Sequence, residues 1–278
     1  MLIYVDDILI IGNDHITISS LKLFLHNRFR IKYLGDLKFF LDIEVSRSKK
    51  CIFISQRKYT LEIIKDGGYL GVKPVDFPME QNTKLFDEGG LLKDSSVYKL
   101  VVGRLIYLTI TCPNITYTVH ILSRFMHAPC KPYMKVAMCV LRYLKNNPSQ
   151  GLFFPSQNDL SLHAFCDSDW GGYPVSRKST TDYCVFLGSS LISWRTKRQK
   201  TVSLSSAKGE YRVLTGTCCD LIWLRSLLKD LRILHPKPTL LHYDNKVALH
   251  IAAKLIFHER TRLIEMDCHF IRDKIQDG

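Results

Sequence analysis

Three carboxylates interrupt apolar segments at positions where a structural residue would be expected. Asp167 ends the run 162–167, Asp244 ends the run 240–244, and Glu210 lies on the apolar stripe of a long helical pattern. Burial of an unpaired carboxylate costs several kcal/mol unless a cation compensates its charge. Three such residues on neighbouring elements predict a divalent-metal site, which in a basic protein favours phosphodiester chemistry.

The positions of these acids would allow them to converge. Glu210 falls in the N-terminal turn of its helix, on the face expected to pack on a sheet, and the strands that carry Asp167 and Asp244 could lie side by side. Converging acids can hold two Mg²⁺ ions, which position a water molecule and stabilise the leaving oxygen in phosphodiester cleavage. A structural explanation stays open, because Glu210 could complement the helix dipole and Asp244 could cap a helix that begins at residue 245.

The second half of the chain supplies the elements that must position these acids. At about 147–155 the hydrophobic pattern changes from helical to alternating, and a domain boundary is expected there. Three strands, a long helix, a further strand and a last helix are expected at 160–166, 181–187, 191–194, 206–231, 239–243 and 245–253. The long helix keeps a 3.6-residue apolar period, and Ser205 or Ser206 can cap its start. This order predicts an α/β domain in which the long helix, the first to follow the strands, covers one face of the sheet.

The first half carries a second acidic pair. Residues 2–11 are rich in strand formers with Asp6 and Asp7 at their centre, so two strands flanking a tight turn are expected. An irregular stretch over 67–92 predicts a loop or linker. The remaining patterns predict a helix at 16–28, a hairpin at 39–45 and 51–55, and helices at 56–65, 97–111, 115–126 and 133–146.

Composition indicates the class of partner. The chain has 278 residues, enough for two domains, and a formal net charge of +13. Nucleic acid fits this charge best, because phosphate neutralisation by Lys and Arg supplies most non-specific affinity. A basic protein without such a partner is the alternative.

Neither a membrane nor secretion is indicated by the sequence. Nine cysteines without a C-x-x-C pair favour reduced thiols in an intracellular compartment, cytoplasmic or nuclear. No basic segment precedes the first apolar strand, so a signal peptide is not expected. The longest apolar stretch, 100–110, is too short to span a bilayer and contains Arg104.

Ordered motifs run through the whole chain. The second half contains Phe-Cys-Asp-Ser-Asp-Trp-Gly-Gly (165–172), Ser-Ser-Ala-Lys-Gly-Glu-Tyr-Arg (205–212) and Tyr-Asp-Asn-Lys-Val-Ala-Leu-His-Ile-Ala (243–252). The first half contains Tyr-Val-Asp-Asp (4–7), Leu-Gly-Asp-Leu-Lys-Phe-Phe-Leu (34–41) and Val-Gly-Arg-Leu-Ile-Tyr-Leu-Thr (102–109). These strings resemble Pol polyproteins of copia-type retrotransposons: the ribonuclease H domain, the reverse transcriptase palm motif and the stretch between them.

The resemblance implies roles for individual residues. Asp167, Glu210 and Asp244 correspond to three of the four metal-binding acids of ribonuclease H, which hold two Mg²⁺ ions in an intact site. Asp6 and Asp7 correspond to the polymerase pair, of which the first is the usual metal ligand. The implied partner is an RNA–DNA hybrid or another nucleic acid. Six basic residues would lie near its phosphates, with a solvated basic face as the alternative for each: Arg177, Lys178, Arg195, Lys197, Arg198 and Lys200.

The resemblance also implies that both active sites are incomplete. In the family, a third palm carboxylate and the fingers would precede residue 1, and a last strand and helix with the fourth ribonuclease H acid would follow residue 278. Lys208 stands where the family usually has Glu, and Asp42 and Asp182 stand where Gly is common, a residue that can serve either a positive φ or a close approach of the backbone.

We therefore expect a mixed α/β protein that is a copy of the Pol protein truncated at both ends. Residues 1–150 would be a palm remnant with thumb or connection helices. Residues 156–278 would form a ribonuclease H-like domain without its last strand and helix. Polymerase activity is not expected, and nuclease activity is expected to be weak or absent. The alternatives are a non-catalytic nucleic-acid-binding remnant and a relic that is never expressed.

Overall fold

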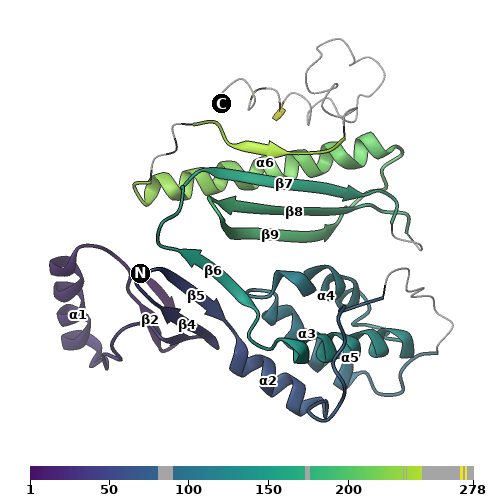
Figure 1. The fold of residues 1–278 in the computed structure, drawn as a ribbon, viewed down its shortest axis with the longest axis horizontal. Coiled ribbons are helices and arrows are strands. Elements are labelled where there is room, and N and C mark those ends of the chain that lie inside the picture. Colours follow the sequence, from purple (N-terminus) through teal and green to yellow (C-terminus); the bar gives the residue numbers. More distant parts are fainter. Residues whose placement is uncertain are drawn as a thin grey trace.

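Helices and strands are mixed along the whole described chain (Figure 1). The structure is a computed structural model that describes residues 1–80, 90–172, 176–233, 235, 237–245, 270, 271 and 273. Its strands are β1 Leu2–Tyr4, β2 Asp7–Leu9, β3 Phe39–Phe40, β4 Ile43–Arg47, β5 Cys51–Ser55, β6 Gly151–Pro155, β7 Leu162–Asp169, β8 Thr180–Leu187, β9 Ser190–Arg198 and β10 Leu240–His242. Its helices are α1 His15–Phe29, α2 Arg57–Asp66, α3 Ser96–Leu108, the 3-10 turn η2 Pro113–Ile115, α4 Thr116–Ser123, α5 Lys131–Asn146 and α6 Ser206–Asp230. The expected α/β class is confirmed.

The chain begins with the expected hairpin. β1 and β2 pair antiparallel with Tyr4 opposite Asp7, so Val5 and Asp6 form the two-residue turn. Val5 has a φ of 46°, the left-handed conformation that two-residue hairpin turns require. Asp6 and Asp7 are both exposed.

The first four-stranded sheet has the order β3-β4-β5-β6. β3, β4 and β5 form an antiparallel meander, which confirms the hairpin expected at 39–45 and 51–55. β6 returns to this sheet after α5 and pairs with β5, with Gly151 opposite Ser55. The segment in which the sequence pattern changes is thus itself a strand of the first sheet. The expected division of the chain into 1–150 and 156–278 stays a prediction.

A cluster of four helices packs beside the first sheet. α2, α3, α4 and α5 share one apolar core, in which Tyr98, Leu105, Tyr133 and Leu141 are almost completely buried. Their ranges agree with the expected helices to within a few residues. Of the predicted irregular stretch 67–92, residues 81–89 lie outside the described residues, and residues 67–80 contain no helix or strand.

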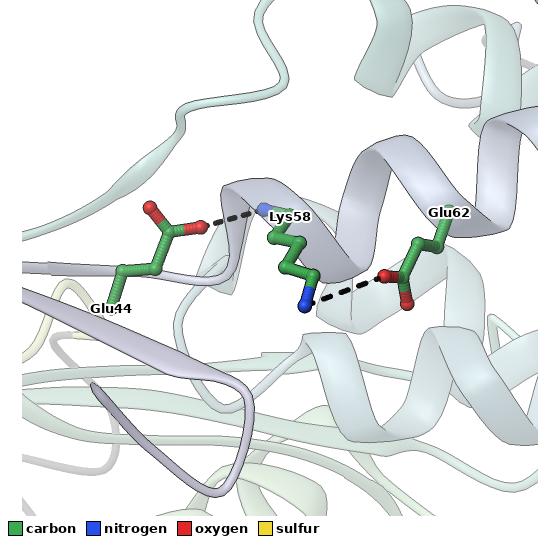
Figure 2. Close-up of polar contacts among 3 residues, drawn as sticks. All are labelled: Glu44, Lys58 and Glu62. Atoms are coloured by element: carbon green, nitrogen blue, oxygen red, sulfur yellow. Dashed lines mark hydrogen bonds and ion pairs between the residues drawn. The ribbon is translucent and has the colours of Figure 1, made fainter.

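The sheet is linked to these helices at the start of α2. The preceding residue, Gln56, makes no side-chain cap, and Glu44 on β4 takes this role by accepting a hydrogen bond from the backbone N–H of Lys58 at 2.7 Å (Figure 2). One of the unsatisfied N–H groups of the first turn is thereby paired by a residue from another element. Lys58 Nζ also lies 4.0 Å from Glu62 Oε1 along the exposed face of the helix (Figure 2).

The second four-stranded sheet has the order β10-β7-β8-β9. β7, β8 and β9 form an antiparallel meander, and β10 joins it parallel to β7 after the crossover through α6. α6 crosses one face of this sheet, where Cys166 and Tyr183 pack on Tyr211 and Leu214 (Figure 1). This order of elements matches the expected one as far as β10; the helix expected at 245–253 lies outside the described residues.

The two halves meet where β9 lies against the helices. Trp194 Nε1 donates a hydrogen bond to the carbonyl oxygen of Thr109 at 3.2 Å, and the backbone N–H of Arg198 donates to His120 Nε2 at 3.2 Å. β6 also contacts β9. A strand of the second sheet therefore has polar contacts with the helical cluster as well as with its own sheet.

The structure bears on the expectations for the backbone at Asp42 and Asp182 and for the cysteines. Asp42 has a φ of 57°, as expected for a position where Gly is common, whereas Asp182 lies within β8 and is not among the residues of positive φ. The cysteines in the described part of the chain, eight in number, are all free. Among the described helices, none combines the length and the apolar character needed to cross a bilayer.

Candidate metal and nucleic-acid site

The parallel pair β7–β10 sets the spacing of two of the predicted acids. Leu240 lies opposite His163 and His242 opposite Phe165. Asp167 lies two residues beyond Phe165 on β7, and Asp244 lies two residues beyond His242, the last residue of β10. The side-by-side strands assumed from the sequence are therefore present, and both acids are exposed at the carboxyl end of the pair.

The alternation of side chains shows which face of the sheet these acids share. Along β7, Leu162, Ala164, Cys166 and Ser168 are buried toward α6, whereas Asp167 is exposed on the opposite, open face. Phe165 and His242 also lie on the open face and stack with ring centroids 4.6 Å apart and planes 16° apart. Because Asp167 follows Phe165 by two residues on β7, it belongs to the open face; Asp244, after the end of β10, is exposed.

Glu210 approaches from the covered side. It is the fifth residue of α6, only 7% exposed, and its Oε2 accepts a hydrogen bond from the Tyr243 hydroxyl at 2.9 Å. Burial raises the pKa of Glu210 above its usual value, and the negative charges of Asp167 and Asp244 raise it further, against hydrogen bonds from Tyr243 and Asn245. Glu210 is thus an electrostatic neighbour of both other predicted acids.

The three acids do not form a closed ligand set. Asp167 Oδ1 accepts a hydrogen bond from the neighbouring backbone N–H of Ser168 at 2.7 Å, and Glu210 is held by Tyr243. Within the described residues, no three His, Cys, Asp or Glu side chains are grouped so that they could hold one metal ion. The chemistry of the donors suits Mg²⁺, because Mg²⁺ prefers oxygen ligands and all three groups are carboxylates. A bound cation would also reduce the repulsion between their negative charges. Their positions suit it only in part, since Asp167 and Glu210 reach the site from opposite faces.

Two more acids lie on the open face, and neither was predicted as a metal ligand. Asp182 on β8 lies directly opposite Asp167, and Asp169 follows Asp167 by two residues. Burial and the charge of Asp167 raise the pKa of Asp169; burial raises that of Asp182, with Asp167 and Asp169 adding to the effect and a hydrogen bond with Thr196 opposing it. Asp182 was identified in the sequence only as a replacement of Gly. The strand register that makes it a neighbour of Asp167 is not visible in the sequence.

The six predicted phosphate-binding residues divide into separate groups. Arg195 and Lys197 are exposed on one side of the edge strand β9, and Arg198 points to the other side, where β9 contacts α4. Lys178 Nζ donates a hydrogen bond to the carbonyl oxygen of Lys200 at 2.6 Å. This bond joins the loop before β8 to the loop after β9. Arg177 is exposed, with a φ of 48°.

Two further features concern the predicted incompleteness of the sites. Lys208, which stands where the family usually has Glu, is 9% exposed and lies two residues before Glu210 on α6, a spacing that does not bring two side chains to the same face of a helix. Asp6 and Asp7 remain an exposed pair at the tip of the β1–β2 hairpin.

Comparison with known proteins gives consistent matches. Residues 1–81 match the family described as reverse transcriptase (RNA-dependent DNA polymerase). The whole chain is 41% identical over 279 residues to the retrovirus-related Pol polyprotein from transposon RE2 of Arabidopsis thaliana. It is 32% identical over 289 residues to that from transposon TNT 1-94 of Nicotiana tabacum. It covers 19% and 22% of these two proteins, about a fifth of their length.

A shorter relative is covered almost completely. An uncharacterized mitochondrial protein of Arabidopsis thaliana is 39% identical over 223 residues, which are 80% of this chain and 93% of that protein.

Proposed function

Because the chain belongs to the family of copia-type retrotransposon Pol polyproteins, we propose that residues from about 156 onward derive from its ribonuclease H domain. Residues 1–150 would then comprise the end of the reverse transcriptase palm, followed by thumb or connection helices. The ancestral activities would be RNA-directed DNA synthesis and Mg²⁺-dependent cleavage of RNA in RNA–DNA hybrids.

The register of β10 beside β7 is the observation that carries this proposal. The last paired residues, His242 on β10 and Phe165 on β7, each lie two residues before one of the acids Asp244 and Asp167, so the parallel pair leads both acids to the same end of the sheet. A helix between the third and fourth strands of the sheet then supplies Glu210, whose pKa is raised by burial first and then by the charges of both acids. A meander of three strands, a crossover helix and a parallel fourth strand agree with the proposed ribonuclease H-like fold.

Asp167, Glu210 and Asp244 would hold the metal. Bound Mg²⁺ would supply an activated water and charge stabilisation at the leaving oxygen. The protein residues set how well such a site forms: Tyr243 fixes one carboxylate oxygen of Glu210, and the Ser168 N–H fixes one of Asp167.

We expect the nuclease activity of this chain to be slow or absent. The described acids are not grouped as a ligand set, and Lys208 stands where the family usually has Glu. Polymerase activity is not expected from the Asp6–Asp7 turn alone. We also place the protein inside the cell, in the cytoplasm or nucleus, in line with a Pol origin.

The second candidate function is nucleic-acid binding without catalysis. The net charge of +13 and the exposed cations of β9 favour it, since binding through phosphates needs no metal.

A cleavage assay separates the two functions. Purified chain is incubated with an end-labelled RNA–DNA hybrid in Mg²⁺ or EDTA, together with the variants Asp167→Asn and Lys49→Gln. Slow cleavage that requires Mg²⁺ and is lost in Asp167→Asn but kept in Lys49→Gln supports the nuclease. Salt-sensitive binding without any cleavage supports the second candidate. Cleavage that survives Asp167→Asn would refute the assigned site.

A further inference from the structure

A small cavity lies where the first sheet joins the helical cluster. Its volume is about 290 Å³, at the lower end of the range of about 300–1,000 Å³ that is usual for ligand pockets. Three segments supply its lining: β5 at Phe53, residues 111–114 around the start of η2, and residues 147–151 between the end of α5 and the start of β6. The cavity is therefore sized for a small molecule or for one small group of a larger ligand.

The lining of this cavity is polar but uncharged. Asn114, Asn147, Ser149 and Gln150 contribute amide and hydroxyl groups, and no Asp, Glu, Lys, Arg or His is among the described residues that line it. An amide side chain presents a donor and an acceptor together, so it can pair with a matching edge of a ligand. Such a lining favours a neutral ligand with its own donors and acceptors over a phosphate or a carboxylate.

Hydrogen bonds hold part of this lining in place. Cys112 Sγ donates a hydrogen bond to Gln150 Oε1 at 3.1 Å, and Gln150 Nε2 donates one to the Tyr143 hydroxyl oxygen at 3.2 Å. Asn114 Nδ2 donates to the same oxygen at 3.5 Å. The side chains of Asn147 and of the serine make no hydrogen bond within the described part of the chain, so their donors and acceptors are open to water or a ligand.

One wall of the cavity is aromatic. The partly buried Phe53 pairs across the strands with Phe153, but its ring leans toward the start of β6, where Gly151 lines the cavity. A Cβ built on Gly151 would lie 2.9 Å from Phe53 Cζ, so the absence of a side chain there leaves room for the ring. Aromatic rings stack on the faces of other planar rings.

We propose that this cavity binds one unpaired nucleobase, which stacks on Phe53 and forms hydrogen bonds along its edge with Asn114 and Asn147. A nucleobase is a neutral planar ring with donors and acceptors on its edge, so it fits both the aromatic wall and the uncharged lining. The phosphates attached to it would remain outside. The inference rests on the proposed function in that the base belongs to a nucleic acid, but it requires neither cleavage nor a metal. A free nucleoside offers the same chemistry, and the test includes one.

The test compares two probes that differ only in their bases. The full chain is titrated in EDTA into a fluorescein-labelled RNA–DNA hybrid with a short single-stranded overhang, and into the same hybrid with an abasic overhang. The phosphates are equal in number, so binding through charge contributes equally to both. Anisotropy should show the overhang with bases bound roughly five- to a hundredfold more tightly, the range expected for stacking of one base on an aromatic ring.

Two variants test the residues assigned to the cavity. Phe53→Leu keeps an apolar side chain without the ring and should remove most of the preference for the overhang with bases. Asn147→Ala changes an exposed residue, so folding should be retained, and it should reduce the preference roughly two- to tenfold. Phe39→Leu, at a phenylalanine that is 48% exposed on β3 of the same sheet, is the matched control and should keep the preference.

The outcomes separate this site from the proposed function. Equal binding of the two overhangs, or a preference kept in both Phe53→Leu and Asn147→Ala, would overturn the site, while salt-sensitive binding of a blunt hybrid would leave nucleic-acid binding itself supported. If the chain binds no hybrid, the ligand assigned under the proposed function is wrong. The site is then upheld as a nucleoside site if calorimetry detects binding of free adenosine or uridine that Phe53→Leu weakens, and it is overturned if neither nucleoside binds.

Discussion

The Tyr243 hydroxyl donates a hydrogen bond to Glu210 Oε2 at 2.9 Å, joining the residue after β10 to the first turns of α6. This contact lies on the covered side of the sheet, and Asp244, the next residue, is exposed. It orients the one buried carboxylate among the three predicted acids. The pKa of Tyr243 is itself raised, by burial first and then by Glu210, so the phenol remains a donor at physiological pH.

Replacement of Tyr243 by Phe should weaken this link. Glu210 would lose a donor that lowers its pKa, so its pKa should rise further, and the protein should lose about 1 kcal/mol of stability. Carbon-13 NMR titration of the Glu210 carboxyl and urea denaturation check the two effects. Tyr33→Phe, at a tyrosine that is 62% exposed, is the control and should change neither. An unchanged Glu210 titration in Tyr243→Phe would mean that the hydrogen bond does not form in solution.

The stability of the protein should depend on the charge of Glu210. Because its folded pKa is raised, the folded state binds a proton more tightly than the unfolded chain, and stability falls as pH rises from the ordinary value of 4.5 through the folded pKa. Glu210→Gln removes this term while retaining an oxygen that can accept from Tyr243. In EDTA, the stability of the variant relative to the natural protein should therefore increase across that pH window. A constant difference between pH 4 and 8, a range chosen to bracket the usual and raised values, would show that Glu210 titrates normally.

The position of β6 in the first sheet can be tested with one glycine. A Cβ at Gly151 would collide with the backbone carbonyl oxygen of Ile54 on the paired strand, so Gly151→Ala should cost about 1–3 kcal/mol of unfolding free energy. Gly103→Ala is the matched control, because Gly103 is exposed inside α3 with nothing within 4 Å of an added Cβ. There the substitution should stabilise the protein by about 1 kcal/mol. Equal effects at both sites in thermal denaturation would contradict the pairing of β6 with β5.

The start of α2 should depend on Glu44. Loss of its carboxylate leaves the Lys58 N–H without its cap, so Glu44→Ala should cost about 1 kcal/mol in urea denaturation. Glu62→Ala is the comparison, because it removes only an exposed pair with a 4.0 Å separation and should cost less than about 0.5 kcal/mol. A larger loss in Glu62→Ala than in Glu44→Ala would contradict the capping role.

The sequence predicts the local parts of the second sheet well. The 3.6-residue apolar period predicts α6, and Ser205 caps it as expected by accepting from the Lys208 N–H at 3.3 Å. The alternating segments predict β7, β8 and β9, and their ends differ from the structure by a few residues. These features depend on neighbours in the chain, so a single sequence contains the information.

A single sequence does not show how strands that are distant in the chain pair with one another. Nothing local indicates that β6 pairs with β5 across about a hundred residues, with Cys51 opposite Pro155. The same limit concealed Asp182 as the partner of Asp167. The face on which Asp167 lies follows from the buried positions on either side of it, Cys166 and Ser168. An apolar run that ends in an acid does not reveal which of its residues will be covered.

Paramagnetic broadening by Mn²⁺ tests the assigned cation site most directly. Mn²⁺ accepts the same carboxylate ligands as Mg²⁺, and it broadens amide signals only near the site where it binds. Substoichiometric Mn²⁺ should broaden the amides of Asp167, Glu210 and Asp244 together, excess Mg²⁺ should restore them, and Asp167→Asn should weaken the effect at all three. Broadening at one of these residues without the others, or undiminished broadening in Asp167→Asn, would contradict a shared site.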